Sequence, residues 1–189
     1  MYTGEKIRLR EYRQTDLPEV MGQVNDYASV RRSATGLILP ATADDEMRWI
    51  SQQSSMTRGE YQFAIETLNG HYVGGCGFQR VDWKNRVAQI GILIGNASMR
   101  GKGYGSDAIR VLCRIGFGEM NLHKLTLSMI SGNAPAVRCY NACGFTVEGT
   151  LRQEVFREDE YHDLIVMGLL RDEWRARNAR SCLGENQQS

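Results

Sequence analysis

A short loop near the middle of the chain combines alternating glycines with two cations. Residues 99–105 read Met-Arg-Gly-Lys-Gly-Tyr-Gly, with glycine at every second position from Gly101 to Gly105. An apolar, strand-like segment at 87–94 precedes the loop, and a helical pattern follows at 106 to about 119. Glycine lets backbone N–H groups approach an anion closely, and a helix start adds unpaired donors. The loop therefore predicts a phosphate-binding site.

Two common phosphate loops do not fit this spacing. A P-loop has four residues between its first glycine and its Gly-Lys pair, whereas five residues separate Gly95 from Gly101. Gly103 also replaces the hydroxyl residue that would bind magnesium. The dinucleotide fingerprint needs a third glycine where this chain has Ser106. A loop whose glycines only serve turns remains the alternative.

A second motif makes the loop more specific. Arg100, Gly103 and Gly105 match the pattern Arg/Gln-x-x-Gly-x-Gly/Ala, and a further stretch begins 28 residues after Gly105. Together they resemble the GCN5-related N-acetyltransferase (GNAT) superfamily, in the branch of ribosomal-protein N-terminal and spermidine acetyltransferases. The similarity covers about residues 6–170. The second signature lies at Asn133, Ala136, Tyr140, Gly144 and Phe145.

The resemblance implies an α/β (α+β) fold and a bound co-substrate. The fold is a single GNAT-like domain, a mixed, splayed, antiparallel-rich sheet of six or seven strands with about four helices. Acetyl-CoA would lie between the fourth strand, at 86–94, and the fifth, at 124–130. Asn133 would either orient the cofactor or simply cap a helix. The other implied cofactor-binding residues are Ile92, Leu93, Ile94, Arg100, Gly101, Lys102, Gly103, Tyr104, Gly105 and Ser106.

The implied reaction is direct attack of an amine on the thioester, with Tyr140 protonating the departing thiolate. A thiol and a phenol have reference pKa values that differ by about 1.5 units, or about 2 kcal/mol, which an enzyme environment can offset. The alternative is that Tyr140 only packs against the sheet. Neither a metal nor a covalent intermediate is implied. Turnover distinguishes this enzyme from a non-catalytic acyl-CoA-binding sensor or interaction module.

The catalytic base is not evident from the sequence. Several relatives carry a glutamate early in the fourth strand, where this chain has Gln89, which cannot accept the proton. A water chain or a backbone carbonyl would then serve. Polar side chains near strand ends are weaker candidates, because such residues are usually only solvated. They are Glu66, His71 and Asp82, while His123 and His162 are expected to be structural.

The acceptor pocket is expected at 25–38 and 156–162, the regions that line it in this fold. Arg31 and Arg32 would suit an acidic acceptor, and the acidic run 158–160 would suit a polyamine, although both are also ordinary surface charges. A protein N-terminus, a polyamine and another small amine all remain candidate acceptors. The tryptophans, Trp49, Trp83 and Trp174, are expected to be packing residues.

Periodicity predicts the elements that position these residues. Strands are expected at 6–10, 62–68, 72–80, 86–94, 124–130, 146–157 and 162–170. Helices are expected after Asp16, from 42–44 to about 53, after the glycine loop, and from Asn133 to Gly144. Asn69-Gly70 predicts a hairpin. The acetyltransferase domain is expected at 1–170, with a C-terminal extension at 171–189 that is helical and then disordered.

Composition narrows the class of protein. A length of 189 residues and a hydrophobic content of 42% suit one ordered domain. The net charge of +1 gives no indication of general nucleic-acid binding. No segment has the run of apolar residues of a membrane span or signal peptide, so a cytoplasmic protein is expected. Five irregularly spaced cysteines indicate free thiols. Cys139 and Cys143 are four apart but lack partners for a metal site. The resemblance also leaves a homodimer open.

Overall fold

The structure, a computed structural model, describes residues 2–31, 36–53 and 60–184. These residues form one eight-stranded sheet in the order β1-β2-β3-β4-β5-β6-β8-β7. The strands are β1 (Tyr2–Thr3), β2 (Ile7–Arg10), β3 (Tyr61–Thr67), β4 (Tyr72–Asp82), β5 (Val87–Ile94), β6 (Lys124–Ile130), β7 (Thr146–Arg157) and β8 (Glu160–Leu170). The helices are α1 (Leu17–Val24), α2 (Tyr27–Val30), α3 (Ala43–Gln53), α4 (Tyr104–Arg114), α5 (Ala134–Cys143) and α6 (Arg171–Gly184).

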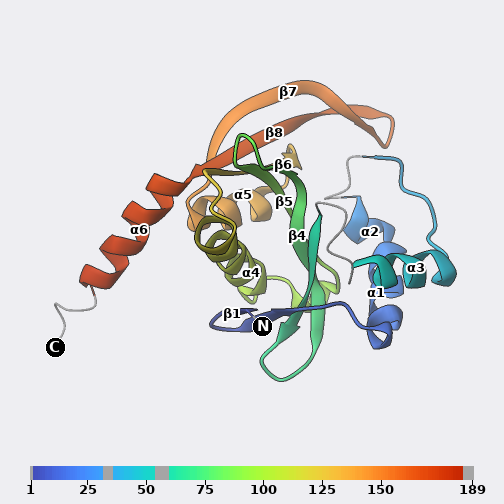
Figure 1. The fold of residues 1–189 in the computed structure, drawn as a ribbon. Helices are drawn as coiled ribbons and strands as arrows, with labels where there is room; N and C mark the ends of the chain where they lie inside the picture. The colour runs from blue at the N-terminus through green and yellow to red at the C-terminus, as the bar shows by residue number, and fades with distance from the viewer. Residues whose placement is uncertain (1, 32–35, 54–59, 185–189) are drawn as a thin grey trace.

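The sheet has helices on both faces. Figure 1 shows α4 and α5 on one side of the central strands and α1 to α3 on the other. The face of α4 predicted to pack on the sheet is buried, since Ala108 and Leu112 are fully enclosed. A π-helical turn, Ile115–Glu119, continues α4, and its Gly116 lies close to Phe78 and Leu125. The mixed α/β fold predicted from the sequence is therefore present.

Turn residues account for the N-terminal half of the sheet. β2, β3, β4 and β5 are successive antiparallel neighbours. The predicted hairpin at Asn69-Gly70 joins β3 to β4, and Gly70 has a φ of +87°, which glycine adopts without strain. A polar turn between Asp82 and Asn85 joins β4 to β5, with the Asn85 amide donating to the Asp82 carboxylate. This half of the sheet forms a continuous wall.

The sheet opens between β5 and β6. These two strands are parallel and pair at only three positions, from Val87↔Lys124 to Gln89↔Thr126. β6 then continues to pair with β8 over its full length, whereas β5 continues along β4. Beyond Gln89 the edge of β5 that faces β6 has no strand partner among the described residues. The splay exposes backbone in the middle of the sheet.

The described residues contain more elements than the sequence predicted, with eight strands and six helices in place of six or seven strands and about four helices. β1 has only two residues and α2 a single turn, too short for a periodic pattern to show. α6 begins at Arg171 as expected and packs Trp174 on Phe117, with ring centroids 5.3 Å apart. The expected disorder falls on residues 185–189, which lie outside the described residues.

Candidate functional site

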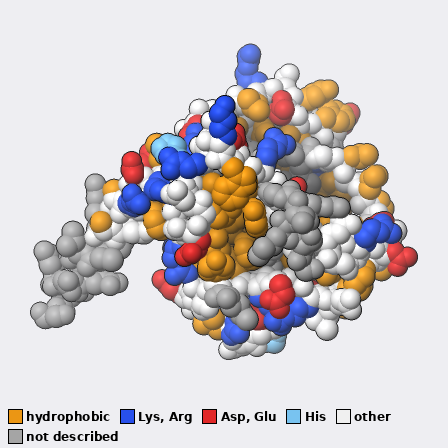
Figure 2. Space-filling model, viewed as in Figure 1, with side chains coloured by type: hydrophobic (Ala, Val, Ile, Leu, Met, Phe, Trp, Pro, Cys, Tyr) orange, Lys and Arg blue, Asp and Glu red, His pale blue; other side chains and the backbone are white. Residues whose placement is uncertain are grey.

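One cavity of about 1250 Å³ runs through the splay of the sheet. It exceeds the usual 300–1,000 Å³ of a single small-molecule site, so it has room for two reactants. Figure 2 shows hydrophobic side chains gathered on the outer face between α4–α5 and β4. We call the wall of β5, the glycine loop and α5 the donor limb. We count the lining residues of β6 and the first turn of α4, Ser128, Met129 and Ser106, with the donor limb. We call the remaining wall the acceptor limb; it consists of Tyr12, Val20, Gln23, Val24, Ser29, Val30, Glu46, Trp49, Gln62, Tyr72, Gly75, Cys76 and Gln79.

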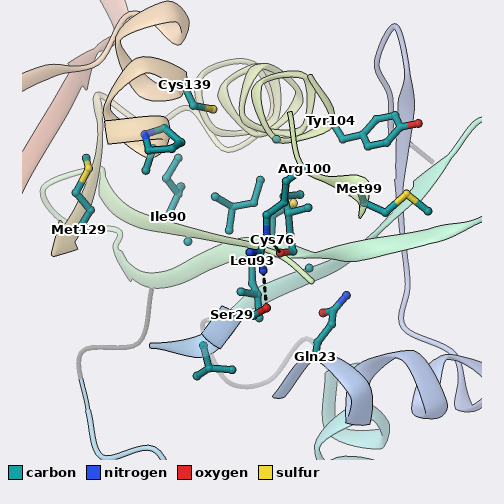
Figure 3. Close-up of a pocket in the computed structure, with 18 of the residues that line it drawn as sticks. Gln23, Ser29, Cys76, Ile90, Leu93, Met99, Arg100, Tyr104, Met129 and Cys139 are labelled. Atoms are coloured by element: carbon teal, nitrogen blue, oxygen red, sulfur yellow. Dashed lines mark hydrogen bonds between the residues drawn. The ribbon is translucent and has the colours of Figure 1, made fainter. Parts of the chain in front are cut away.

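The structure brings the predicted site residues together, with one exception. Lys102 does not line the cavity among the described residues. Figure 3 shows the labelled lining side chains, including Leu93, Arg100 and Tyr104 around the same space. The predicted residues that line the cavity are Ile92, Leu93, Ile94, Arg100, Gly101, Gly103, Tyr104, Gly105, Ser106, Asn133 and Tyr140.

The glycine loop leads into a helix, as the sequence predicts, but α4 begins at Tyr104, two residues before the expected start at 106. Gly101 and Gly103 have φ values of +73° and +85°, the left-handed region that favours glycine. Gly103 is the N-cap residue of α4, and the amides of Tyr104, Gly105 and Ser106 come first in the helix, where no intrahelical acceptor is available. These donors, with the positive end of the helix dipole, fit a pyrophosphate group.

Two contacts brace this loop from outside the cavity. The Asp107 carboxylate, which is buried in the first turn of α4, accepts hydrogen bonds from the amides of Lys6 and Ile7, the former at 2.7 Å. The Lys6 Nζ donates to the carbonyl of Lys102 at 3.1 Å. Lys6 and the first residue of β2 therefore hold the loop in place, an arrangement that no local pattern in the sequence indicates.

Arg100 occupies a different position from the one expected for a phosphate ligand. Its amide donates to the Ala97 carbonyl within a turn, so the free amides of the loop begin after it. Its guanidinium donates to the carbonyl of Gly95 at 2.8 Å and to the Ser29 hydroxyl at 2.5 Å (Figure 3). Ser29 donates in turn to Asp26. Arg100 thus ties the end of β5 to α2, which carries part of the acceptor limb.

Tyr140 lies on α5 with its side chain largely buried in the donor limb. Its ring packs edge-on against Phe145, with centroids 6.2 Å apart. Burial, with a smaller contribution from Cys139 and Cys143, raises the pKa of the Tyr140 phenol above its usual value. The phenol therefore carries its proton at neutral pH. Asn133 caps α5, because its Oδ1 accepts from the amide of Ala136 at 3.3 Å.

A pair of thiols adjoins Tyr140 and was not predicted as part of the site. The Cys139 Sγ lies 3.2 Å from the Ser106 hydroxyl, and Cys143 donates to the Ser106 carbonyl. Hydrogen bonding from Cys143 lowers the pKa of the Cys139 thiol, against the effect of burial, and Ser106 contributes in the same direction. The only sequence signal was the i, i+4 spacing of the two cysteines, which we considered for metal binding.

The base candidates named from the sequence lie elsewhere. The Glu66 carboxylate pairs with Arg10 at 2.8 Å, and Asp82 caps its own turn. Among the described lining residues neither of them occurs, nor do His71, His123 or His162. Gln89 does line the cavity, where its Nε2 donates to the Ser128 hydroxyl at 3.4 Å.

The acceptor pocket differs from the expected one. Ser29 and Val30 line the cavity, but no described residue of 156–162 does. Arg31 and Glu158, which we expected to attract opposite kinds of acceptor, form an ion pair with each other at 2.5 Å. Arg32 lies outside the described residues. This ion pair therefore connects the β7–β8 hairpin to the end of α2, and neither residue lines the cavity.

The tryptophans also differ from expectation in one case. Trp49 lines the cavity and contacts Tyr12 edge-on, with ring centroids 4.8 Å apart, so it is not only a packing residue. Trp83 packs on Tyr61 at the surface, and Trp174 packs on Phe117.

Comparison with known proteins decides the family. A family model described as an acetyltransferase (GNAT) domain matches residues 6–146. The chain belongs to the GNAT acetyltransferase family. It is an acetyl-CoA-dependent N-acetyltransferase with acetyl-CoA as co-substrate, as the two motifs predicted.

Individual relatives agree with this assignment. A prophage-derived uncharacterized N-acetyltransferase, YokL, from Bacillus subtilis is 27% identical over 92% of this GNAT chain and 94% of its own. Spermidine N(1)-acetyltransferase from Escherichia coli is 28% identical over 93% of this chain and 92% of its own. The crystal structure of Vibrio cholerae spermidine N-acetyltransferase in complex with CoA and spermine covers 89% of this chain and 97% of its own, at 24% identity. Its TM-score of 0.80 shows that the two proteins share a fold.

Proposed function

We propose that this enzyme transfers the acetyl group directly from acetyl-CoA to a primary amine of a small molecule, with Tyr140 as the acid. The observation that carries the proposal is the single cavity, which joins the glycine loop, Tyr140 and a largely uncharged acceptor limb. A relative named spermidine N(1)-acetyltransferase, similar over nearly the whole chain, supports a small amine over a protein N-terminus.

The residues of the donor limb have distinct roles in this proposal. The amides that begin α4 bind the pyrophosphate, and the open edge of β5 near Ile92–Ile94 pairs with the pantetheine arm. One of those strand amides would stabilise the developing oxyanion. Acetyl-CoA supplies the acetyl group and the thiol leaving group. This division of roles needs neither a metal nor a nucleophilic side chain.

Tyr140 supplies the proton that the departing sulfur requires. Burial raises the pKa of its phenol, which by itself makes the phenol a weaker acid. Desolvation in the same cavity would also raise the pKa of the CoA thiol, which reduces the difference between the two groups. Proton transfer from Tyr140 to sulfur is therefore feasible at neutral pH.

Turnover with a panel of amines tests the function. Release of the CoA thiol is measured for aliphatic amines, amino sugars and peptides with a free N-terminus. Because Tyr140→Phe removes the acidic hydroxyl and keeps the ring, kcat is expected to fall about 100-fold or more while acetyl-CoA binding is retained. Tyr161→Phe is the control, since that ring is exposed outside the cavity. Full activity of Tyr140→Phe would contradict the acid role, and preference for a peptide N-terminus would contradict the small acceptor.

A cytoplasmic location completes the proposal. Cys76, Cys113, Cys139 and Cys143 are all free thiols in the structure, as expected in a reducing compartment. Separately, no helix of the described residues has the length and apolar character needed to cross a membrane.

A further inference from the structure

The two limbs of the cavity meet at the residue that follows β5. Gly95 is buried, and its carbonyl accepts from the Arg100 guanidinium at 2.8 Å, while the Ser29 hydroxyl lies 3.5 Å from the same oxygen. A Cβ at Gly95 would lie 2.0 Å from the Gln23 side chain of α1, so this helix also packs directly on the backbone here. Gly95 therefore brings a residue of the donor limb, Arg100, together with residues of the two helices α1 and α2 of the acceptor limb.

Arg100 lies between the two segments proposed to hold acetyl-CoA. The open strand edge at Ile92–Ile94 precedes it, and the free amides of residues 104–106 follow it. Besides the bond to Gly95, its guanidinium donates to the carbonyl of Ile94 at 3.2 Å, so the side chain is attached to the end of the strand. A co-substrate bound across the strand edge and the glycine loop would restrain Arg100 from both directions.

The short helix α2 depends on outside contacts for its order. It is a single turn of four residues, which has little stability of its own. The ion pair of Arg31 with Glu158 is exposed to solvent, and such pairs contribute little. Ser29 is instead 3% exposed, and its hydroxyl accepts from the Arg100 guanidinium at 2.5 Å (Figure 3). Because a charge-assisted hydrogen bond is the stronger kind, the contact with Arg100 is the firmer of these two attachments.

We propose that Arg100 and Ser29 are positioning residues that couple the two limbs, so that acetyl-CoA, by restraining Arg100, orders α2 and completes the wall that receives the amine. The inference rests on the proposed function, since it concerns how the acceptor site of the same reaction is assembled. Ser29 and Val30 of α2 line the acceptor limb, so their order determines how well the amine binds. The amine should therefore bind more tightly to the acetyl-CoA complex than to the free enzyme.

Hydrogen exchange of α2 reports this coupling without any acceptor. The amides of residues 29–31 all donate within the turn, so their exchange follows its opening. Exchange is measured by mass spectrometry on the full-length enzyme with and without saturating CoA. In the parent, CoA is expected to slow exchange at 29–31 about fivefold or more and to protect the amides at 104–106. In Ser29→Ala, CoA should still protect 104–106 but leave exchange at 29–31 unchanged.

Glu158→Gln is the matched control, because it removes the other attachment of α2 without touching Arg100. Exchange of α2 without CoA is expected to rise in both variants, but the slowing by CoA should be lost only in Ser29→Ala. Equal slowing by CoA in Ser29→Ala and the parent would overturn the coupling, as would protection of 104–106 in the parent with no change at 29–31. Absence of protection at 104–106 would contradict the donor site of the proposed function, and the coupling with it.

Steady-state kinetics give a second readout, with saturating acetyl-CoA and the amine of highest kcat/KM in the turnover panel. Ser29→Ala is expected to raise KM for the amine about fivefold and to leave kcat within about twofold, since Tyr140 and the donor limb are unchanged. Arg100→Met should raise this KM similarly, and adding Ser29→Ala to it should change little, because both substitutions remove the same contact. Additive increases would mean that Ser29 acts on the amine independently of Arg100, which would overturn the inference.

Discussion

Tyr140 and Cys139 are neighbours on α5, yet the pKa values of their side chains are shifted in opposite directions. Burial raises the pKa of the Tyr140 phenol, while hydrogen bonding from Cys143 lowers the pKa of the Cys139 thiol. Ser106, at the start of α4, is the residue that links this thiol to the loop proposed to bind pyrophosphate. The chemistry of α5 therefore depends on contacts with α4 that are made across the sheet opening.

Cys139 is expected to be the most reactive described cysteine, because its thiolate forms at lower pH than that of an ordinary thiol. Burial raises the pKa of Cys113 to about 12, so that thiol should stay unreactive and serves as an internal control. Iodoacetamide labelling, followed by mass spectrometry at several pH values, should modify Cys139 near neutral pH and Cys113 hardly at all. Acetyl-CoA should slow labelling, since Cys139 lines the donor limb. Unchanged labelling with acetyl-CoA present would place the co-substrate elsewhere.

The resemblance to the family motifs pointed to Tyr140 and the glycine loop, and both line one cavity, while their roles stay predictions. It was not sufficient for Arg100, whose guanidinium donates to the nearby Gly95 carbonyl and to Ser29, a residue 71 positions away that only the fold brings close. Ser29 was not singled out for the same reason. A serine between two predicted helices has no local signal, and its significance arises from the contacts that α2 makes with the end of β5.

At the scale of elements, the splay between β5 and β6 creates the site. The sequence predicted both strands because apolar runs bounded by turn residues are strong local signals. The pairing of β5 with β6 stops after three positions. This is a property of the assembled sheet, and no local pattern in the sequence encodes it. The glycine loop follows β5 directly and leads into α4 at this opening.

The glycines of the loop are predicted to differ in importance. An alanine at Gly103 would have to adopt a φ of +85°, at a cost of about 1–2 kcal/mol, with its Cβ 3.1 Å from the Lys6 Nζ. An alanine Cβ at Gly105 would meet Ile94 and Cys139 at 3.7 Å or more, an ordinary contact. Calorimetric titration should show acetyl-CoA affinity falling about tenfold in Gly103→Ala and less in Gly105→Ala. The reverse order would contradict the loop geometry.

At the scale of the whole molecule, the acceptor limb depends on how the N-terminal segments attach to the sheet. Arg10 in β2 donates to Asp16, just before α1, and to Glu66 in β3, each at 2.8 Å. All three side chains are buried. This network fixes the start of α1 against the two strands. It joins segments 56 residues apart in sequence, so the individual charges gave no indication of it.

The network is predicted to make stability depend on pH in the acid range. Burial alone would raise the pKa of Asp16, but hydrogen bonds from Arg10 and the Arg13 amide outweigh it and lower the pKa. A carboxyl with a depressed folded-state pKa stabilises the protein above its unfolded pKa, near 3.9, and this contribution is lost as pH falls through the folded-state value. Asp16→Asn should therefore lower the free energy of unfolding most near neutral pH.

Breaking a buried ion pair on one side leaves an uncompensated charge, so Asp16→Asn is expected to lower the free energy of unfolding by about 3 kcal/mol at neutral pH. Urea unfolding from neutral pH to below about pH 4 should show this difference shrinking, because the parent protein then loses the same interaction as Asp16 becomes protonated. Asp44→Asn, at an exposed position, should change stability by about 0.5 kcal/mol or less throughout. A constant difference across the pH range would mean that Asp16 acts by packing and not through its charge.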